Sequence, residues 1–197
     1  MPHHLLRTIR DEHHSLTVMI HALQMVIHRG PGQAPGRYFE IVRSMLVYVK
    51  EFSEHVHHPK EAQLVFPRVM QVAQDTVHAV AGIEQAYRLN VAELDALQIL
   101  LAAWQIGHTQ QRHAFEREAL RFCDDYLAQI RLEEVSIIPV ADQLVTEAQW
   151  DRLAKRYHRP AAPEAGLVPA DSGYELMYNR IALWLTRFLT PSVPLHR

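Results

Sequence analysis

The sequence has little of several features that would narrow its function at once. It contains one cysteine, Cys123, in 197 residues, so an internal disulfide framework is excluded. Lysine and arginine number 20 against 22 aspartate and glutamate residues, and the formal net charge of -2 provides no basic field for nucleic acid. No apolar run is long enough to span a bilayer, and the N-terminus lacks the apolar segment of a signal peptide. We therefore expect a cytoplasmic protein that binds neither nucleic acid nor a membrane.

What stands out in the composition is its 14 histidines. Histidine is the commonest metal ligand among the side chains, and it also titrates near neutral pH. The sequence has no glycine-rich phosphate loop and no Ser/His/Asp or Cys/His arrangement typical of nucleophilic catalysis. No acid–base pair stands apart from the candidate metal ligands described below. We therefore do not expect an enzyme.

Helical periodicity dominates the chain, and no alternating strand pattern is evident. Apolar residues at intervals of three and four predict four long helices, over about residues 5–28, 41–67, 76–106 and 112–138. Because the breaks between them are short, an up-down-up-down four-helix bundle over residues 1–155 is the economical packing. Pro59 is expected to bend the second helix, and Pro67 to end it.

Residues 156–197 are predicted to form a C-terminal helical appendage. A short helix precedes it, with Thr146 as N-cap and Gln149 at the capping-box position. A Pro/Ala/Gly-rich loop covers residues 159–173, and a last amphipathic helix covers residues 174–189. We expect this last helix to pack on the bundle or on a partner subunit, as in a homodimer.

The segment HHPKEAQLVFP, residues 57–67, has a counterpart in QIRLEEVSIIP, residues 129–139. The first has His, Glu and Pro separated by four and six residues, and the second has Gln, Glu and Pro with the same spacing. A four-residue step turns an α-helix by only about 40°, so both polar side chains of each pair lie on one face. The sequence therefore contains an internal repeat of two helical hairpins.

Each hairpin also offers one residue from its first helix. His13 precedes His57 by 44 residues, and Tyr87 precedes Gln129 by 42. His13 continues the apolar stripe of the first helix, and Tyr87 falls on the apolar face of the third. Four-helix bundles build di-metal sites from such inward side chains. The candidate metal ligands are His13, His57, Glu61 and Glu133, with Tyr87 and Gln129 at positions where further histidines would be expected.

Three segments, RDEHHSL, FSEHVHHPKEAQLVFP and AQIRLEEVSIIPVADQLVTEAQW, resemble the hemerythrin-like (HHE cation-binding) family, in particular its bacterial branch with an H-H-P-K-E motif. The resemblance covers about residues 5–155. It implies a four-helix bundle that holds two non-haem irons, with roles in oxygen binding, oxygen or nitric oxide sensing and iron handling. The four His and Glu candidates match the family's ligand positions, whereas Tyr87 and Gln129 replace histidines that hold the same iron.

Three outcomes are compatible with these departures. In the first, the four remaining ligands hold a single ion, for which iron, manganese or zinc is suitable. In the second, Tyr87 binds a ferric ion as phenolate, Gln129 adds a weak oxygen ligand, and two ions are retained. In the third, the site holds no metal, and Tyr87 and Gln129 hydrogen-bond the two glutamates in a polar core.

Two functional hypotheses follow. The first is a non-haem metal-binding protein with iron as the expected metal and a degenerate di-iron site. It would bind or sense a small ligand (a diatomic molecule or peroxide) or handle iron. The second is a metal-free helical bundle that acts through its surface or by dimerisation.

Overall fold

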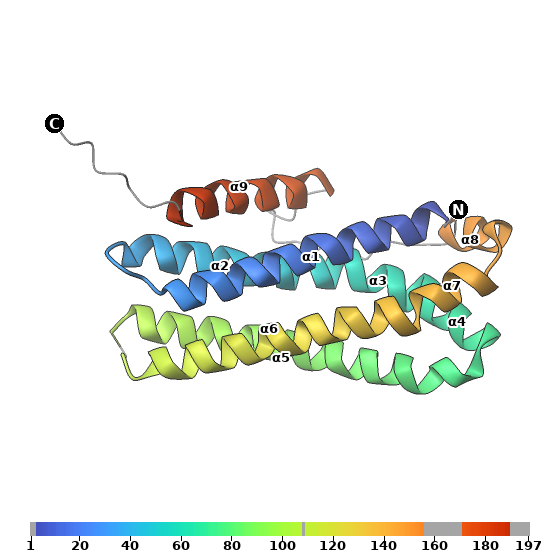
Figure 1. Cartoon of the computed structure of the whole chain (residues 1–197), viewed down its shortest axis with the longest axis horizontal. Coiled ribbons are helices and arrows are strands. Elements are labelled where there is room, and N and C mark those ends of the chain that lie inside the picture. Colours follow the sequence, from blue (N-terminus) through green and yellow to red (C-terminus); the bar gives the residue numbers. More distant parts are fainter. Residues whose placement is uncertain (1–2, 108, 156–170, 190–197) are drawn as a thin grey trace.

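The computed structural model describes residues 3–107, 109–155 and 171–189. Every regular element in these ranges is a helix and none is a strand, so the prediction of an all-α protein is confirmed. Figure 1 shows long helices that run side by side along the length of the molecule. The four longest in the bundle are α1 (His4–Arg29), α2 (Pro35–Phe52), α5 (Val77–Gln105) and α6 (Gln111–Ser136).

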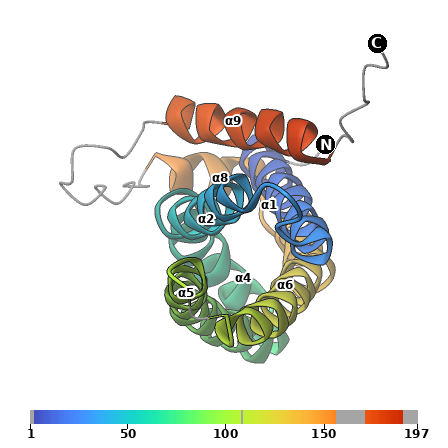
Figure 2. The ribbon, with the colours of Figure 1, turned by 90° about the vertical axis from the view of Figure 1, so that its left-hand side faces the viewer.

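These four long helices enclose a common core. α1 packs against α2 and α6, and α5 packs against the same two helices, so that each has two neighbours in the ring seen end-on in Figure 2. The short helices α7 (Ile138–Leu144) and α8 (Glu147–Ala154) lie at the end of the bundle where α1 begins (Figure 1). None of the described helices is long and apolar enough to cross a membrane.

α1 agrees with its predicted range to within one residue at each end. At its start, the His3 side chain accepts a hydrogen bond from the backbone N–H of Leu5 at 3.2 Å. At its end, Gly30 has a φ of 68°, a left-handed conformation that glycine adopts without the steric cost of a Cβ. The predicted stripe is completely buried, and it comprises Leu6, Ile9, Leu16, Ile20 and Leu23.

The second predicted helix is longer and less regular than its sequence indicates. It continues past Pro67 to Val72, so the prediction that it stops near Pro67 is wrong. Two π-helical turns divide it. In chain order its pieces are α2, a π turn at Ser53–His57, α3 (His58–Lys60), a π turn at Glu61–Val65, and α4 (Phe66–Val72).

Each π turn is followed, two residues after its last residue, by a proline. In a regular helix a proline donates no hydrogen bond and its ring collides with the carbonyl four residues earlier. In these wider turns the N–H of His58 bonds to the carbonyl of Ser53, and the N–H of Phe66 bonds to that of Glu61. The helix therefore passes both prolines without ending. His57 is the last residue of the first π turn, and Glu61 is the first residue of the second.

The third and fourth predicted helices correspond to α5 and α6 to within two residues at each end. A short 3₁₀ turn, Gln74–Thr76, leads into α5. Gly107, with a φ of 107°, follows α5. Pro139 lies in the first turn of α7, immediately after the end of α6, where its missing N–H breaks no helical hydrogen bond.

The helices of the C-terminal part also agree with prediction. Thr146 caps α8 and forms the predicted capping box, in which its backbone N–H donates to the side-chain oxygen of Gln149 at 2.8 Å. α9 (Asp171–Leu189) begins three residues earlier than predicted. The predicted loop is therefore wrong at residues 171–173, and its remainder lies outside the described residues. α9 packs along α2, where Tyr174 is buried (Figures 1 and 2).

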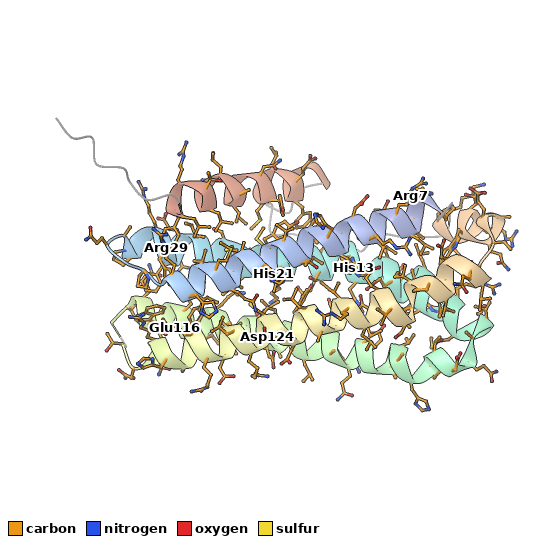
Figure 3. All side chains as sticks on the ribbon, viewed as in Figure 1. Arg7, His13, His21, Arg29, Glu116 and Asp124 are labelled. Carbon is orange, nitrogen blue, oxygen red and sulfur yellow. The ribbon has the colours of Figure 1, made fainter. Side chains whose placement is uncertain are left out.

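The buried apolar side chains form two clusters at different levels along the bundle. On α1, Ile9 belongs to one cluster and Leu16 to the other, and the buried His13 lies between them. The other long helical segments also contribute apolar residues to both clusters, and on each of them a buried polar residue lies between the two contributions. In Figure 3, His13 lies along α1 between Arg7, near one end, and Arg29, at the other. The fold thus contains one polar level between two apolar ones.

Candidate metal centre

Four buried side chains converge at this polar level. His13 comes from α1, His57 and Glu61 come from the two π turns, and Glu133 comes from α6. Their exposed fractions are 2%, 5%, 1% and 1% respectively. Each offers one nitrogen or oxygen atom, and these four atoms all lie within 4.8 Å of one another. The structure thus brings together the four His and Glu residues that the sequence selects from distant positions.

The polar atoms of this group lie close together, but two of them lack a well-formed hydrogen bond. His13 Nε2 lies 3.0 Å from Glu133 Oε2 and 3.3 Å from Glu61 Oε1. His57 Nε2 lies 3.4 Å from Glu61 Oε2. Despite these short distances, His13 Nε2 and Glu61 Oε1 have no hydrogen-bond partner of acceptable geometry among the described residues. Buried polar atoms without partners are rare in folded proteins because each costs free energy.

The spacing of the four atoms fits a single metal ion. Iron, manganese and zinc bind imidazole nitrogen and carboxylate oxygen at about 2.0–2.2 Å, which places the ligand atoms of one ion roughly 3–4.4 Å apart. His13 Nε2 lies within this range of Glu133 Oε2 and of Glu61 Oε1, at 3.0 and 3.3 Å, and His57 Nε2 lies 3.4 Å from the other oxygen of Glu61. The widest separation among the four ligand atoms is bounded by 4.8 Å, slightly above the range. The residues present therefore fit a metal ion in both chemistry and spacing.

A carboxylate outside the group fixes the orientation of His13. Its Nδ1 lies 2.5 Å from Glu134 Oε1, and Arg10 is 3.7 Å from the other oxygen of Glu134. Since an ionised carboxylate can only accept, Nδ1 is the donor, and the neutral ring then keeps a lone pair on Nε2. Histidines that bind metals are typically held in this way, with the second ring nitrogen on a carboxylate.

His57 has the same arrangement on the other side. Its Nδ1 donates to Glu12 Oε2 at 3.1 Å, and the other oxygen of Glu12 accepts a hydrogen bond from Lys60. Glu12 is buried, with an exposed fraction of 8%, so the pairing with Lys60 compensates its charge. Both imidazoles therefore direct Nε2 toward the centre, although they belong to different helices.

The surroundings shift the pKa values of these side chains in opposite directions. Burial disfavours the charged form of His13, but its contacts with Glu133, Glu134 and Glu61 outweigh burial and raise the pKa of His13 to about 12. Burial and the nearby charge of Glu133 raise the pKa of Glu61. Burial also opposes ionisation of Glu133, but His13 outweighs it and lowers the pKa of Glu133. Without a cation, a proton on His13 stabilises the group. A metal ion would displace this proton, so metal binding releases protons.

Gln129 lies next to the group and hydrogen-bonds one of its members. Its Nε2 donates to Glu133 Oε1 at 3.0 Å, and its Oε1 accepts a hydrogen bond from Asn90 Nδ2 at 2.7 Å. Glu133 is therefore hydrogen-bonded at Oε1, while its Oε2 faces His13. This is the hydrogen bond to a glutamate that the metal-free alternative predicts for Gln129.

Tyr87 occupies a different place from the one its apolar stripe indicates. It is half-buried at the edge of that face, and its ring stacks on His58 with centroids 3.5 Å apart. The buried residues of α5 near this level are instead Ile83, Asn90 and Leu94. Burial raises the pKa of Tyr87 above its ordinary value, which opposes the phenolate that a ferric ion would require.

The second half of the repeat adds one member, Glu133, to the buried group. Among the described residues, the only other close group of three or more His, Cys, Asp or Glu side chains is Glu51, Glu54 and His55. All three are half-buried, and His55 lies 3.3 Å from Glu51. A second buried set of ligands is thus absent from the part of the chain that the structure describes.

Sequence reasoning missed four residues that support the group: Glu12, Lys60, Glu134 and Asn90. The first three are adjacent in sequence to His13, Glu61 and Glu133. A charged residue next to a candidate ligand was therefore a usable signal for a supporting residue. Which side chain it contacts depends on how the helices pack. Asn90 also had a signal, because it lies seven residues after Ile83 and four before Leu94, on the buried face of α5.

No family model matches the chain, and no curated protein matches it. The resemblance to hemerythrin-like proteins therefore rests on the motifs of this chain.

Proposed function

We propose that this protein binds one divalent transition-metal ion, iron first among the candidates, inside a hemerythrin-like bundle of up-down-up-down topology. One observation carries the proposal: two imidazoles and two carboxylates meet in a buried group in which His13 Nε2 and Glu61 Oε1 lie close together without a hydrogen bond of acceptable geometry. A cation at the centre of the group would satisfy both atoms. The ring order of the four long helices, in which consecutive long segments are neighbours, supports the topology.

The donor set favours a transition metal over calcium or magnesium. Those two ions prefer shells made of oxygen alone, whereas imidazole nitrogen suits iron and zinc. Two histidines with carboxylates and open positions are typical of non-haem ferrous sites. When bound, iron in such a shell supplies open coordination positions for a small molecule such as dioxygen, nitric oxide or peroxide, which suits sensing, and the same residues suit iron handling.

The residues of the chain prepare the centre in three ways. Glu134 and Glu12 hold the imidazoles with Nε2 inward. Glu61 and Glu133 carry two negative charges when ionised, which would neutralise a divalent cation in a region where an unpaired charge is costly. The apolar clusters on both sides exclude water along the bundle axis.

Two contacts support one ion over two. The amide of Gln129 occupies Glu133 Oε1, an oxygen that would otherwise be free to bridge a second ion. Tyr87 stacks on His58, and burial keeps its hydroxyl protonated. A second ion would require both side chains to rearrange.

The first test is metal content per chain, measured by inductively coupled plasma mass spectrometry. The protein is produced in iron-supplemented medium and purified without exposure to nickel resin. We expect close to one iron per chain. Close to two would show that Tyr87 or Gln129 serves as a ligand. A chain without metal, together with a dimer mass in light scattering, would contradict the proposal and favour the metal-free interaction module.

The second test compares His57→Ala with His14→Ala. His14 is exposed on α1, so its substitution controls for the loss of a histidine near the centre. We expect His57→Ala to remove most bound metal and His14→Ala to retain it. A ligand at a hundredfold excess over its Kd stabilises the folded state by about 2.7 kcal/mol. His57→Ala should therefore lose thermal stability mainly in metal-loaded protein. Equal losses in loaded and stripped protein would show that His57 has a packing role only.

A further inference from the structure

A hollow of about 300 Å³ opens on the surface where the end of α9 meets the turn between α1 and α2. Residues 31–34 of the turn line one side of it, and Phe188 of α9 lines another. Figure 1 shows that α9 ends near this turn, at the end of the bundle opposite to α8. Arg29, which also lines the hollow, is about 24 Å from His13 along the axis of α1. The hollow is therefore separate from the candidate metal centre.

Three arginines from three different helices line this hollow. Arg29 is the last residue of α1, Arg37 lies in the first turn of α2, and Arg187 lies in the last turn of α9. None of the three forms an ion pair with any residue that the structure describes. Like charges that gather without a counter-charge repel one another. The arrangement therefore favours an anion from outside the chain.

The carboxylates closest to these arginines do not neutralise them. Glu40 lines a smaller adjoining pocket together with Arg37 and Arg187, yet it pairs with neither of them in the described structure. Glu116 is held by Arg112 at 2.8 Å. The hollow thus carries an excess of positive charge, although the formal net charge of the whole chain is -2.

Contacts with α9 hold one of the arginines in place before any ligand binds. Arg29 Nη1 donates to the backbone carbonyl of Leu189 at 3.2 Å, and its guanidinium lies 5.2 Å from the centre of the Phe188 ring. A guanidinium has five N–H donors, so one such bond leaves others for a ligand. A side chain that is already ordered loses less entropy on binding.

The start of α2 favours the same kind of ligand. α2 begins at Pro35, and Ala34 before it provides no side-chain cap, so the first backbone N–H groups of the helix have no side-chain partner there. Such groups bind anions, phosphate in particular. Ala34 and Arg37, on either side of this start, both line the hollow. Guanidinium groups add the planar pair of donors that matches two phosphate oxygens.

We propose that this hollow binds the phosphate group of a small soluble molecule, and that the bound ligand links the end of α9 to α1 and α2. A volume of about 300 Å³ is larger than a phosphate ion needs, so part of an organic molecule fits as well. The net charge of -2 gives the chain no general attraction to an anionic membrane, which favours a soluble source of the phosphate. The site is independent of whether the buried centre holds a metal.

The test is isothermal titration calorimetry with pyrophosphate, performed on the full chain as purified and at constant ionic strength. Arg37→Ala and Arg187→Ala each remove one guanidinium from an exposed position, so the fold should persist in both. Arg7→Ala is the matched control, because Arg7 is exposed near the other end of α1 and its loss changes the net charge by the same amount (Figure 3).

We expect the parent and Arg7→Ala to bind pyrophosphate equally well. Arg37→Ala and Arg187→Ala should each bind about tenfold more weakly, since a hydrogen bond between charged groups is lost. Arg37→Lys keeps the charge without the planar pair of donors and should recover only part of the affinity. No binding by the parent, or an equal loss in Arg7→Ala, would overturn the proposal. Sedimentation with vesicles of phosphatidylcholine and phosphatidic acid, without binding of pyrophosphate, would assign the hollow to a lipid headgroup and overturn the soluble ligand.

Hydrogen exchange measured by mass spectrometry tests the link to α9. Pyrophosphate should slow amide exchange in α9 in the parent and in Arg7→Ala, because the ligand joins Arg187 to the arginines of α1 and α2. Arg187→Ala should lose this protection. Unchanged exchange in α9 of a parent saturated with pyrophosphate would show that the ligand does not link the three helices.

Discussion

Glu134 shows how a half-exposed residue can govern a buried one. Its carboxylate accepts the hydrogen bond from His13 Nδ1, and His13 in turn lowers the pKa of Glu134. The bond fixes both the orientation and the tautomer of the imidazole. Without it the ring could turn, or carry its proton on the nitrogen that should bind the metal.

Glu134→Ala should therefore weaken metal affinity by about 10–100-fold, the usual effect of removing a partner of a metal-binding histidine. Glu134→Gln keeps an acceptor oxygen and should lose less. Glu118→Ala is the control, since Glu118 is on the same helix and pairs at the surface with Arg117 and Arg121. A chelator competition titration measures the affinities. Equal affinity for parent and Glu134→Ala would show that the hydrogen bond does not orient the ring.

For single residues, the sequence predicts the helix face on which a side chain lies. It predicts less well which other side chain that residue contacts. His13 was placed inward by the apolar stripe that it continues, and it is buried. Tyr87 was placed by the same reasoning, but it lies at the margin of its face, where contact with His58 decides its environment. Helical periodicity defines a direction to within several tens of degrees, and a ligand role depends on finer differences.

At the scale of elements, the two π turns are the main departure from prediction. A proline in a helical segment predicts that the helix bends or ends there. The sequence pattern does not reveal the third possibility, in which the helix widens into a π turn and continues. The choice depends on packing, since α4 is needed to bury Phe66 and Val69 in the smaller apolar cluster. The turns also set where His57 and Glu61 point, because they lie at the edges of the two wide turns.

Pro59→Ala tests the link between the π turn and the centre. Alanine is about 3 kcal/mol more favourable than proline inside a helix, whereas the loss of the buried ring removes apolar contacts. These effects oppose each other, so the thermal stability of metal-free protein should change little. Metal affinity should fall, because a helix that closes into regular turns rotates Glu61 away from His13. Pro31→Ala, in the turn between α1 and α2, is the control. Unchanged affinity would show that packing alone maintains the π turn.

At the scale of the whole molecule, buried acidic groups predict a loss of stability at alkaline pH. Burial raises the pKa of Cys123 from 9.0 to about 12, and burial also raises that of Tyr38. The unfolded chain loses these protons at lower pH than the folded one, so stability falls as pH rises above the ordinary thiol pKa. The slope is about 1.4 kcal/mol per pH unit for each such group.

Urea unfolding between pH 8 and pH 11 measures this dependence. Cys123→Ala removes one ionising group and should give a shallower decline than the parent between pH 9 and pH 11, whatever its stability at neutral pH. The same decline in both proteins would show that the thiol is not protected in the folded state.

The all-helical class was the most predictable property of the chain, since helical periodicity runs through its long apolar segments and no alternating strand pattern competes with it. Agreement was closest for α1, α5 and α6, whose boundaries coincide with Gly30, Gly107 and Pro139. The position of α9 was left open between the bundle and a partner. It packs on α2. The hydrophobic pattern of α9 shows that one face is buried, but the partner of that face depends on how the surfaces of the two helices fit together.

The order of the proposed ligands along the chain has a consequence for biosynthesis. His13, His57 and Glu61 are made before Glu133, which follows Glu61 by 72 residues. At about 5–20 residues per second, translation leaves the first three without the fourth for roughly 4–14 s. During that interval α1 and the second helical segment present an incomplete set of ligands. A full complement exists only after α6 has left the ribosome and docked, so stable metal loading would follow completion of the bundle.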